Sequence, residues 1–474
     1  MNASSPAFPQ LAERFAAQRR AFAADPNPPV AARRQRLDRL LALIDDNEQA
    51  IIAAIDADFG GRAAQETRIA ELFVTRGAIL HARRHLARWM RTRRVATALA
   101  FLPGRNRLAP QPLGVVGIVS PWNYPIQLTL CPLVAALAAG DRALVKPSEL
   151  TPRVAALLAE LAAKYFDADL VSVVVGDAET GKAFVALPFD HLLFTGSTAV
   201  GRQVAAAAAA NLTPVTLELG GKSPAIFDPS CDLKQASARV AAGKLFNAGQ
   251  TCVAPDYLLV PRGQADAAAA ALAAAMARLY PKLAANADDT AIISDRHRDR
   301  LVAVVAEARE AGARIVEINS AGESFADSRK LAPTLVIGAP QTTRLMREEI
   351  FGPVLPIVEY DQVDDAIAVV NRGERPLALY WFGRDAARRE RVLGETIAGG
   401  VTVNDCLLHF VQEGQPCGGV GASGVGAYHG EWGFRTFSKL KPVFHQSNWS
   451  GFPLLRPPYG KMTDWVLGAL KLLP

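Results

Sequence analysis

The sequence has few cysteines and no spacing that would cross-link them. Five cysteines stand at positions 131, 231, 252, 406 and 417 of 474 residues. Their number is odd and no two form a CxxC pair, which argues against a disulfide framework or a zinc ribbon. The seven histidines contain no HExxH motif. We therefore expect reduced thiols and no metal site.

Long hydrophobic runs are also missing. The longest, residues 267–277, is mostly alanine and falls short of the roughly 20 residues that a membrane-spanning helix needs. The N-terminus has no apolar core of a signal peptide, so we expect a cytoplasmic protein. Half of the residues are hydrophobic and 21% are charged, which excludes a disordered chain. At about 150 residues per domain, the length predicts roughly three structural units.

Acidic residues are absent from residues 72–140, although the chain as a whole carries a charge of only +6. Nine arginines lie in that segment, at positions 76, 83, 84, 88, 91, 93, 94, 105 and 107. Such a patch could bind nucleic acid. It could equally be a basic helix packed near acidic parts of its own fold or of a partner subunit. No nucleic-acid motif accompanies it, so we expect no nucleic-acid partner.

The pattern of apolar residues changes along the chain. Apolar residues from Leu37 to Ile55 recur at spacings of three and four, as one buried helix face would. Short strands then alternate with helices and predict a parallel sheet covered on both faces. These strands are predicted at 113–119, 142–146, 171–175, 191–195 and 214–219. Ligands of such sheets bind at the carboxyl ends of the strands.

A second α/β series extends from about Ser223 to Ile397. Its predicted strands are 256–260, 334–337, 354–359 and 377–382. Residues 418–426 are rich in glycine and predict a flexible loop before a last strand near 435–445. Residues 465–473 form a short apolar helix, which is either an interfacial anchor or, as we expect, a docked tail.

Polar residues at the predicted strand ends could carry chemistry. Cys252 follows a Gly-containing turn and could be a nucleophile, although a single cysteine is more often a core residue. Its pKa would be lowered if it stood near a helix N-terminus. Glu218, at the end of a strand, could be a general base or a turn acceptor. Asn123 could donate to an oxyanion or only shape a turn.

Further residues suit a nucleotide. Lys146 and Glu149 follow a strand and could hold ribose hydroxyls. Gly196, Ser197 and Gly201 open a helix after a strand, which suits a phosphate at the helix N-terminus. The segment is neither a GxGxxG nor a P-loop motif, so by itself it fits packing as well as nucleotide binding.

Taken together, these segments resemble the aldehyde dehydrogenase family over nearly the whole chain. The matching segments are PWNYP (121–125), LVKPSE (144–149), FTGSTAVG (194–201), LELGGKSP (217–224), GQTC (249–252) and EEIFGPVLP (348–356), in the family's order and spacing. Longer stretches such as HARRHLARWM resemble the coniferyl aldehyde dehydrogenase branch, which is related to the class 3 enzymes.

The resemblance implies an α/β aldehyde dehydrogenase fold. It has a Rossmann-like NAD(P)-binding domain at 1–220, interrupted by a bridging hairpin near 97–112. A catalytic domain follows at 221–397. Residues 398–447 then form the active-site loop and a bridging, oligomerisation strand, and 448–474 a C-terminal tail. The short N-terminus favours a homodimer over the tetramer of relatives with longer extensions.

The resemblance also implies roles for individual residues. Cys252 would be the nucleophile, Glu218 the general base, and Asn123 with the Cys252 N–H would hold the oxyanion. The implied cofactor residues are Trp122, Lys146, Glu149, Gly196, Ser197, Gly201, Glu349 and Phe351, and the implied substrate pocket is Tyr124, Thr251, Val253 and Cys417. The charge of Glu149 would repel a 2′-phosphate, which favours NAD, with NADP possible.

The implied reaction is NAD(P)-dependent oxidation of an aldehyde to the acid through a thiohemiacetal and a thioester, with a phenylpropanoid such as coniferaldehyde as substrate. Alternatives are a class 3 type of aliphatic aldehyde dehydrogenase, an acylating enzyme that passes the thioester to coenzyme A, or a non-catalytic relative. Glu218 argues against the acylating enzyme, whose members generally lack this residue. Cys417 stands where the family usually has phenylalanine, and we expect a wider pocket mouth there.

Overall fold

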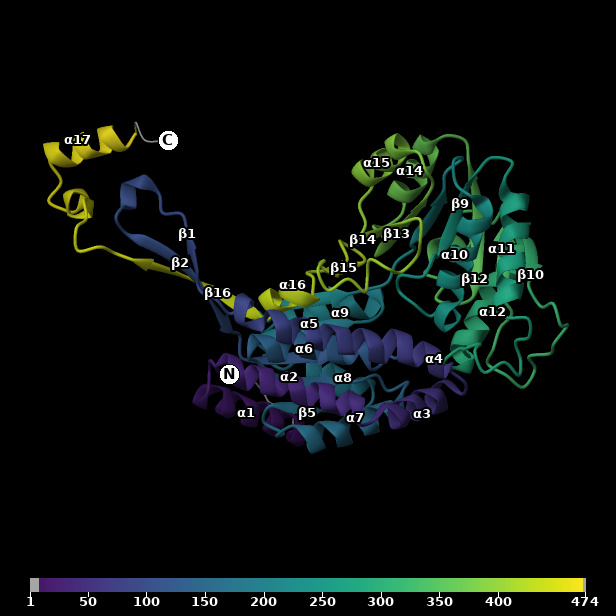
Figure 1. The fold of residues 1–474 in the computed structure, drawn as a ribbon, viewed down its shortest axis with the longest axis horizontal. Helices are drawn as coiled ribbons and strands as arrows, with labels where there is room; N and C mark the ends of the chain where they lie inside the picture. The colour runs from purple at the N-terminus through teal and green to yellow at the C-terminus, as the bar shows by residue number, and fades with distance from the viewer. Residues whose placement is uncertain (1–7, 472–474) are drawn as a thin grey trace.

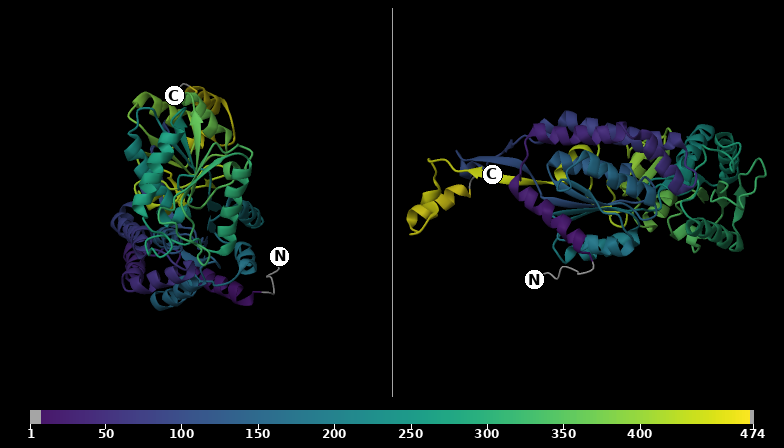
Figure 2. Two further views of the ribbon diagram at one scale, coloured as in Figure 1. Left: turned by 90° about the vertical axis from the view of Figure 1, so that its right-hand side faces the viewer. Right: turned by 90° about the horizontal axis from the view of Figure 1, so that it is seen from below.

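The computed structural model describes residues 8–471 and contains three β-sheets. Two larger sheets, each with its helices, form two lobes, and a narrow arm projects away from them (Figure 1). Seen from below, the arm also extends away from both lobes (Figure 2). Within these described residues, no helix combines the length and apolar character needed to cross a bilayer, and no cluster of three potential metal ligands occurs.

Helices form the first part of the chain. They are α1 (Pro9–Ala24), α2 (Val30–Asp45), α3 (Glu48–Phe59), α4 (Ala64–Glu66), the π-helical turn η1 (Thr67–Phe73) and α5 (Val74–Trp89). The single helix face predicted for 37–55 is wrong, because Asn47 leaves the helical region and its side chain donates to the Leu43 carbonyl. The apolar positions on both sides of the break still enter one core.

The first large sheet has six strands. Their order is β15 (Gly424–Val425), β7 (Val215–Glu218), β6 (His191–Thr195), β3 (Val115–Val119), β4 (Arg142–Lys146) and β5 (Val171–Val173). All pairs are parallel except β15 with β7. The connecting helices are α6 (Gln127–Ala139), α7 (Pro152–Tyr165), α8 (Ala178–Val185) and α9 (Thr198–Ala209). The five predicted strands therefore all exist, as one parallel sheet.

The second large sheet has seven strands. Their order is β10 (Arg314–Glu317), β11 (Thr334–Ile337), β12 (Val354–Tyr360), β9 (Tyr257–Pro261), β8 (Pro224–Phe227), β13 (Ala378–Phe382) and β14 (Gly400–Val403). Its lobe also contains α10 (Leu233–Leu245), the turn η3 (Phe246–Gly249), α11 (Ala265–Leu279), α12 (Asp295–Glu310), α13 (Arg344–Arg347), α14 (Val363–Arg372) and α15 (Ala386–Glu395). The strand β14 extends this sheet beyond the predicted boundary at residue 397.

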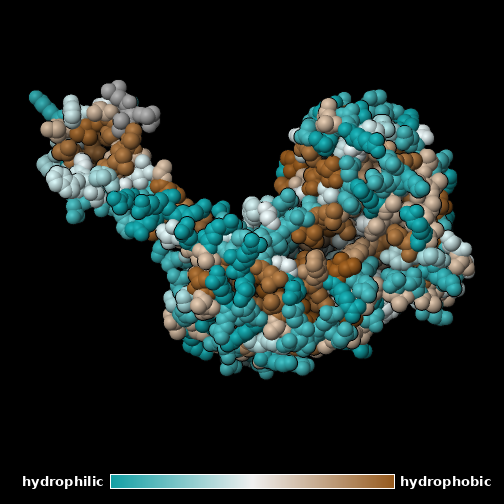
Figure 3. All heavy atoms as spheres, in the orientation of Figure 1, coloured by the Kyte–Doolittle hydropathy of each residue, from teal (hydrophilic) through white to brown (hydrophobic). Residues whose placement is uncertain are grey.

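The arm is a three-stranded antiparallel sheet with a short helical tip. It consists of β1 (Arg93–Val95), η2 (Leu99–Phe101), β2 (Arg105–Pro112), β16 (Ser438–His445), η4 (Phe452–Leu455) and α17 (Lys461–Leu470), and α16 (Gly430–Thr436) leads into it. The predicted hairpin at 97–112 thus begins earlier, at β1. Apolar side chains gather at the tip of the arm (Figure 3).

The tail does not dock on either lobe. Helix α17 packs against η4 at the far end of the arm (Figure 1), and Thr463 donates to the Leu454 carbonyl at 3.1 Å. Trp465 remains 70% exposed. The tail is thus docked on the tip of the arm and not on a lobe.

The glycine-rich segment 418–426 is closely packed rather than a free loop. Gly424 pairs with Glu218 through β15, and a Cβ on Gly424 would lie 2.4 Å from the Leu217 carbonyl oxygen. Glycine permits such a close approach of two backbones. The predicted loop thus contains a two-residue edge strand, β15.

The basic segment lies against acidic residues of its own chain. Arg76 pairs with Asp45 at 3.3 Å and Arg88 with Glu431 at 3.7 Å. Arg83 likewise pairs with Asp38. Helix α5 is thus a basic helix packed near acidic parts of its own fold, as the second interpretation of the sequence has it.

Replacement of a core residue in α3 tests this packing. Ile55 is fully buried, whereas Ile69 in η1 is 57% exposed. We expect Ile55→Ala to lower the free energy of unfolding by about 2–5 kcal/mol, because it leaves a cavity in the helical core. The control Ile69→Ala should change it by about 0.5 kcal/mol or less. Equal effects in denaturant titrations would contradict the assigned core.

Candidate active site

The strands β3 and β6 are parallel neighbours in the six-stranded sheet, so the loops that follow them lie at the same edge. The chain runs from β3 outward through β4 to β5, and then returns to β6 on the other side of β3. This reversal is the topological switch point at which open α/β sheets bind ligands. The loop after β3 contains Trp122 and Asn123, and the loop after β6 contains Gly196 and Ser197.

The seven-stranded sheet contributes residues from loops at the amino ends of its strands. Cys252 lies in the loop before β9, and Glu349 and Phe351 lie in the loop before β12. Glu218 ends β7, and the chain continues directly through Gly220 to β8 of the other sheet. The site is therefore formed where carboxyl ends of one sheet meet amino ends of the other.

Cys252, the candidate nucleophile, follows a strained turn. Asn247 and Ala248 in η3 have φ values of 53° and 52°, a left-handed conformation that costs of order 1–3 kcal/mol at each non-glycine residue. The Gln250 side chain holds the turn: its Nε2 donates to the Asn247 and Ala291 carbonyls, both at 3.1 Å. Strain of this kind persists only where surrounding contacts fix it.

Cys252 is not at a helix N-terminus, so the condition for a lowered pKa is not met. The residue follows η3 in an irregular turn. Burial raises the pKa of the Cys252 thiol above its ordinary value, and the charges of Glu349 and Glu218 raise it further. Removal from water and nearby negative charge both disfavour a thiolate.

Asn123 is fixed beside this turn. Its Nδ2 donates to the Gln250 carbonyl at 3.1 Å. The neighbouring Tyr124 hydroxyl lies 2.6 Å from the Thr251 hydroxyl. The loop after β3 is therefore bonded directly to the two residues that precede Cys252, which brings a side-chain amide next to the thiol.

These groups line one cavity of about 240 Å³. The sequence-predicted residues in its wall are Trp122, Asn123, Gly196, Ser197, Glu218, Cys252, Glu349 and Phe351. Figure 3 shows apolar side chains in the hollow between the two lobes. A cavity with mostly apolar walls and a few converging polar groups is typical of small-molecule sites.

Two buried carboxyl groups face the cavity. Glu218 is 4% exposed and neither of its oxygens has a hydrogen-bond partner within residues 8–471. Burial raises its pKa well above the ordinary range. Burial, reinforced by Asp256, raises the pKa of Glu349 to about 8. Buried polar groups without partners are uncommon and call for a functional explanation.

Comparison with known proteins decides the family. The model of the aldehyde dehydrogenase family matches residues 9–443. A coniferyl aldehyde dehydrogenase of a Pseudomonas species is 48% identical over 442 residues, which cover 92% of this chain and 91% of that protein. The chain belongs to the aldehyde dehydrogenase family.

Solved aldehyde dehydrogenases share the fold. The substrate-bound AldH of Staphylococcus aureus has a TM-score of 0.91 and 37% identity, covering 99% of this chain and 100% of that one. An indole-3-acetaldehyde dehydrogenase of P. syringae, in complex with NAD+, has a TM-score of 0.84 and 25% identity, covering 92% and 89%. The aldehyde dehydrogenase fold of this chain is thus confirmed.

The residues present fit a dinucleotide. Glu349 has an unpartnered buried oxygen, Oε1, in the cavity wall, and the Ser197 hydroxyl caps the N-terminus of α9. Outside the cavity, Lys146 Nζ lies 3.3 Å from Glu149 Oε2 at the end of β4, with the Glu149 side chain 49% exposed. A half-exposed carboxylate and a helix N-terminus suit ribose hydroxyls and phosphates respectively. Gly201 packs α9 against Leu219.

The predicted substrate-pocket residues lie behind the cavity wall. Tyr124, Thr251 and Val253 are buried in the two loops. Cys417 is 7% exposed and forms a backbone bridge with Tyr428. It does not line the cavity, so the expected widening of the mouth at this position is wrong; Tyr428 and Phe410 line that wall.

Sequence reasoning missed several wall residues. They are Pro121, Leu128, Thr195, Leu219, Gly220, His297, Arg300, Leu377, Phe410 and Tyr428. Pro121, Thr195, Leu219 and Gly220 lie within quoted motifs and could have been found there. His297 and Arg300 come from α12, which no motif marks. Arg300 donates to the Glu349 carbonyl at 3.3 Å and so supports that loop.

The raised pKa of Cys252 can be measured by alkylation. Because thiolate is the minor species, the rate constant for iodoacetamide at Cys252 in the cofactor-free protein should rise roughly tenfold per pH unit from pH 7 to 9. Peptide mass spectrometry assigns the modified residue, with Cys252→Ala as the blank. A plateau below pH 8 would show that the pKa is not raised.

Proposed function

We propose that this family member oxidises aldehydes to carboxylic acids through a thioester on Cys252, with NAD as the hydride acceptor. The observation that carries the proposal is the convergence of Cys252, Glu218 and Asn123 on one cavity. These are a nucleophile, a base and an oxyanion donor, drawn from two sheets. A non-catalytic relative would have no need to retain all three.

Each residue has a defined task. The Cys252 thiol gives up its proton to water, its sulfur attacks the aldehyde carbon, and the oxyanion that forms as the C=O double bond opens accepts hydrogen bonds from the Asn123 amide and the Cys252 N–H. When bound, NAD supplies the acceptor for the hydride that leaves that carbon. Glu218 then takes a proton from the water that adds to the thioester, and the C–S bond breaks, so that the acid is released and the Cys252 thiolate is restored. Its raised pKa makes the carboxylate a better proton acceptor near neutral pH.

The cofactor is held by residues from both lobes. Glu349 would hold one ribose, with Phe351 and Trp122 beside the ring; these two aromatic centroids lie 5.4 Å apart. Lys146 and Glu149 would hold the adenosine ribose. The partly exposed charge of Glu149 favours a free diol over a 2′-phosphate, and so NAD over NADP.

The substrate we propose is a phenylpropanoid aldehyde of the coniferaldehyde type. Support comes from the 48% identity to a coniferyl aldehyde dehydrogenase. The aromatic side chains of Phe410 and Tyr428 in the wall also suit a planar ring. Water, rather than coenzyme A, would release the acid because Glu218 is present in the cavity.

Activity assays with matched variants test this function. Wild-type protein should reduce NAD faster with coniferaldehyde than with benzaldehyde, a short aldehyde or a long aliphatic one, and faster than it reduces NADP. Cys252→Ala should lower kcat by at least about 10³-fold, because the nucleophile is lost. Coenzyme A should not be required.

A second variant separates the two half-reactions. Glu218→Gln should still give one rapid equivalent of NADH per site while steady-state turnover falls about 10²-fold or more, because only thioester hydrolysis needs the base. No turnover of any aldehyde by the wild type, or full activity of Cys252→Ala, would refute the proposal. A ranking led by the long aliphatic aldehyde would favour the class 3 alternative.

We further propose a homodimer formed through the arm, in a cytoplasmic protein. The exposed outer edge of β16 in the three-stranded sheet is suited to pairing with a second copy. All five cysteines are free, which agrees with a reducing compartment. Sedimentation at micromolar concentration should give twice the chain mass of 50.6 kDa. A value equal to one chain or to four would contradict the dimer.

A further inference from the structure

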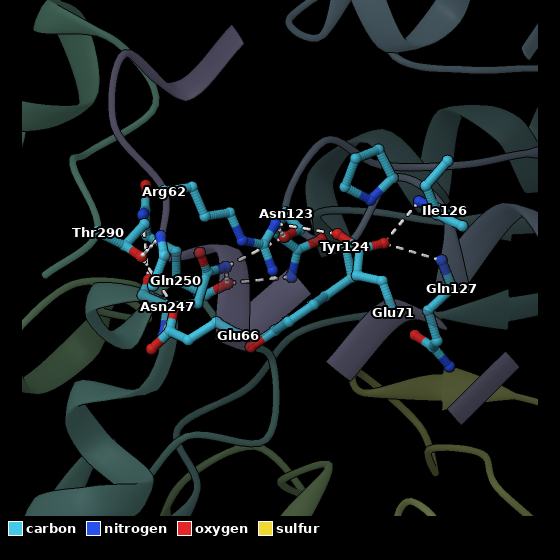
Figure 4. A network of polar contacts seen from close by, with 12 residues as sticks. Arg62, Glu66, Glu71, Asn123, Tyr124, Ile126, Gln127, Asn247, Gln250 and Thr290 are labelled. Atoms are coloured by element: carbon cyan, nitrogen blue, oxygen red, sulfur yellow. Dashed lines mark hydrogen bonds and ion pairs between the residues drawn. The ribbon is translucent and has the colours of Figure 1, made fainter. Parts of the chain in front are cut away.

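A buried group of charges lies outside the catalytic cavity and has no role in the mechanism above. Arg62, Glu66 and Glu71 come from the segment around α4 and η1 and are each less than 8% exposed. Arg62 Nη1 and Glu71 Oε1 form an ion pair of 3.0 Å, with both side chains fully buried. Figure 4 shows these side chains between the loops that carry Asn123 and Gln250.

Glu71 and Arg62 hold the loop that follows β3. Glu71 Oε2 accepts hydrogen bonds from the backbone N–H groups of Ile126 at 2.7 Å and Gln127 at 2.9 Å. Arg62 Nη1 donates to the Asn123 carbonyl at 2.9 Å. One ion pair therefore fixes this loop both at Asn123 and at the start of α6.

Glu66 holds the loop that presents the nucleophile. Its two carboxylate oxygens accept from the Asn247 N–H at 3.0 and 3.1 Å, and Thr290 donates to the same group at 2.8 Å. Asn247 is the first of the two left-handed residues before Cys252. Its Nδ2 donates to the Asn123 carbonyl at 3.1 Å, so this oxygen accepts from both Asn247 and Arg62.

The Arg62 guanidinium contacts the second loop indirectly as well. It lies 5.0 Å from the ring centroid of Tyr124, whose hydroxyl bonds to Thr251 next to the nucleophile. Cation–π contacts of this kind are stronger when water is excluded. Arg62 is thus linked to both sides of the gap between Asn123 and Cys252.

We propose that Arg62, Glu66 and Glu71 are positioning residues that set the place of the Asn123 amide relative to the Cys252 sulfur. This inference rests on the proposed aldehyde oxidation. An oxyanion donor acts only at hydrogen-bond distance from the developing charge, and displacement by about 1 Å can lower a rate 10²-fold. None of the three residues lines the cavity, so each acts through the loop that it holds.

A purely stabilising role accounts poorly for the arrangement. Packed apolar side chains commonly stabilise a core as well as a buried ion pair does. Arg62 Nε and Nη2 also have no hydrogen-bond partner within residues 8–471. The charged atoms are instead directed at backbone groups of the two active-site loops, which apolar side chains could not hold.

Isosteric variants test the proposal. We expect Glu66→Gln and Glu71→Gln to lower kcat about 10- to 100-fold while KM for the aldehyde changes less than about threefold, because substrate still enters an intact cavity. The matched control is Glu48→Gln, which removes an exposed ion pair with Arg68 in the same helical layer and should leave both constants unchanged.

Thiol reactivity gives a second readout that needs no substrate. The rate of iodoacetamide alkylation at Cys252, measured on the cofactor-free protein, should rise at least about fivefold in Glu66→Gln, because a loosened turn exposes the sulfur more often. A fall in kcat together with faster alkylation is the expected signature. A loss of thermal stability with unchanged kcat and unchanged alkylation would overturn the proposal.

The two readouts separate this proposal from the proposed function. A wild type that turns over no aldehyde would refute the function, and the alkylation rates of Glu66→Gln and Glu48→Gln would still decide the positioning role. If Glu71→Gln does not fold, Glu66→Gln decides alone: an unchanged alkylation rate refutes the proposal and a faster one supports it.

Discussion

The hydrogen bond from Asn123 Nδ2 to the Gln250 carbonyl is the contact on which the site depends. It joins a loop at the carboxyl edge of the six-stranded sheet to a loop at the amino edge of the seven-stranded sheet. Neither loop alone contains both Cys252 and Asn123, the residues of the proposed nucleophile and oxyanion donor. The buried charged side chains of Arg62, Glu66 and Glu71 lie around this bond (Figure 4). They hydrogen-bond to backbone groups of the two loops, namely the Asn123 carbonyl and the N–H groups of Asn247 and Ile126. A densely hydrogen-bonded junction of two sheets therefore holds the geometry that the proposed reaction needs.

The same junction sets the electrostatics of the cavity. Cys252, Glu218 and Glu349 share one enclosed space, and burial raises the pKa of each above its ordinary range. In such a space all three cannot be ionised together without cost. The cavity thus favours the neutral forms of these groups, and a positive charge brought into it would favour the ionised forms. Burial in the fold, rather than a helix dipole, therefore determines the direction in which the pKa values of these groups shift.

Much of the fold follows from local sequence. The predicted strands at 142–146, 191–195 and 334–337 coincide with β4, β6 and β11, because strands buried on both faces are continuous apolar runs. The short strands β8 and β14 were missed, since Pro224 opens one and glycine and threonine weaken the apolar pattern of the other. The helix predicted across 37–55 divides at Asn47, whose side chain competes for a backbone carbonyl. Such local competition depends on geometry that apolar spacing does not reveal.

The sequence by itself indicated the family, the position of Glu218 at a strand end, of Asn123 in the loop after a strand and of Cys252 after a glycine-containing turn, and the proposed pairing of a thiol with a carboxylate. These are short motifs whose chemistry is readable in order along the chain. Only the tertiary structure decided that Cys417 lies behind the wall while Tyr428 and Phe410 form it, that the thiol pKa is raised, and that Arg62 and Glu66 hold the active-site loops. Those properties arise from burial and from contacts between residues distant in sequence, and no motif encodes either.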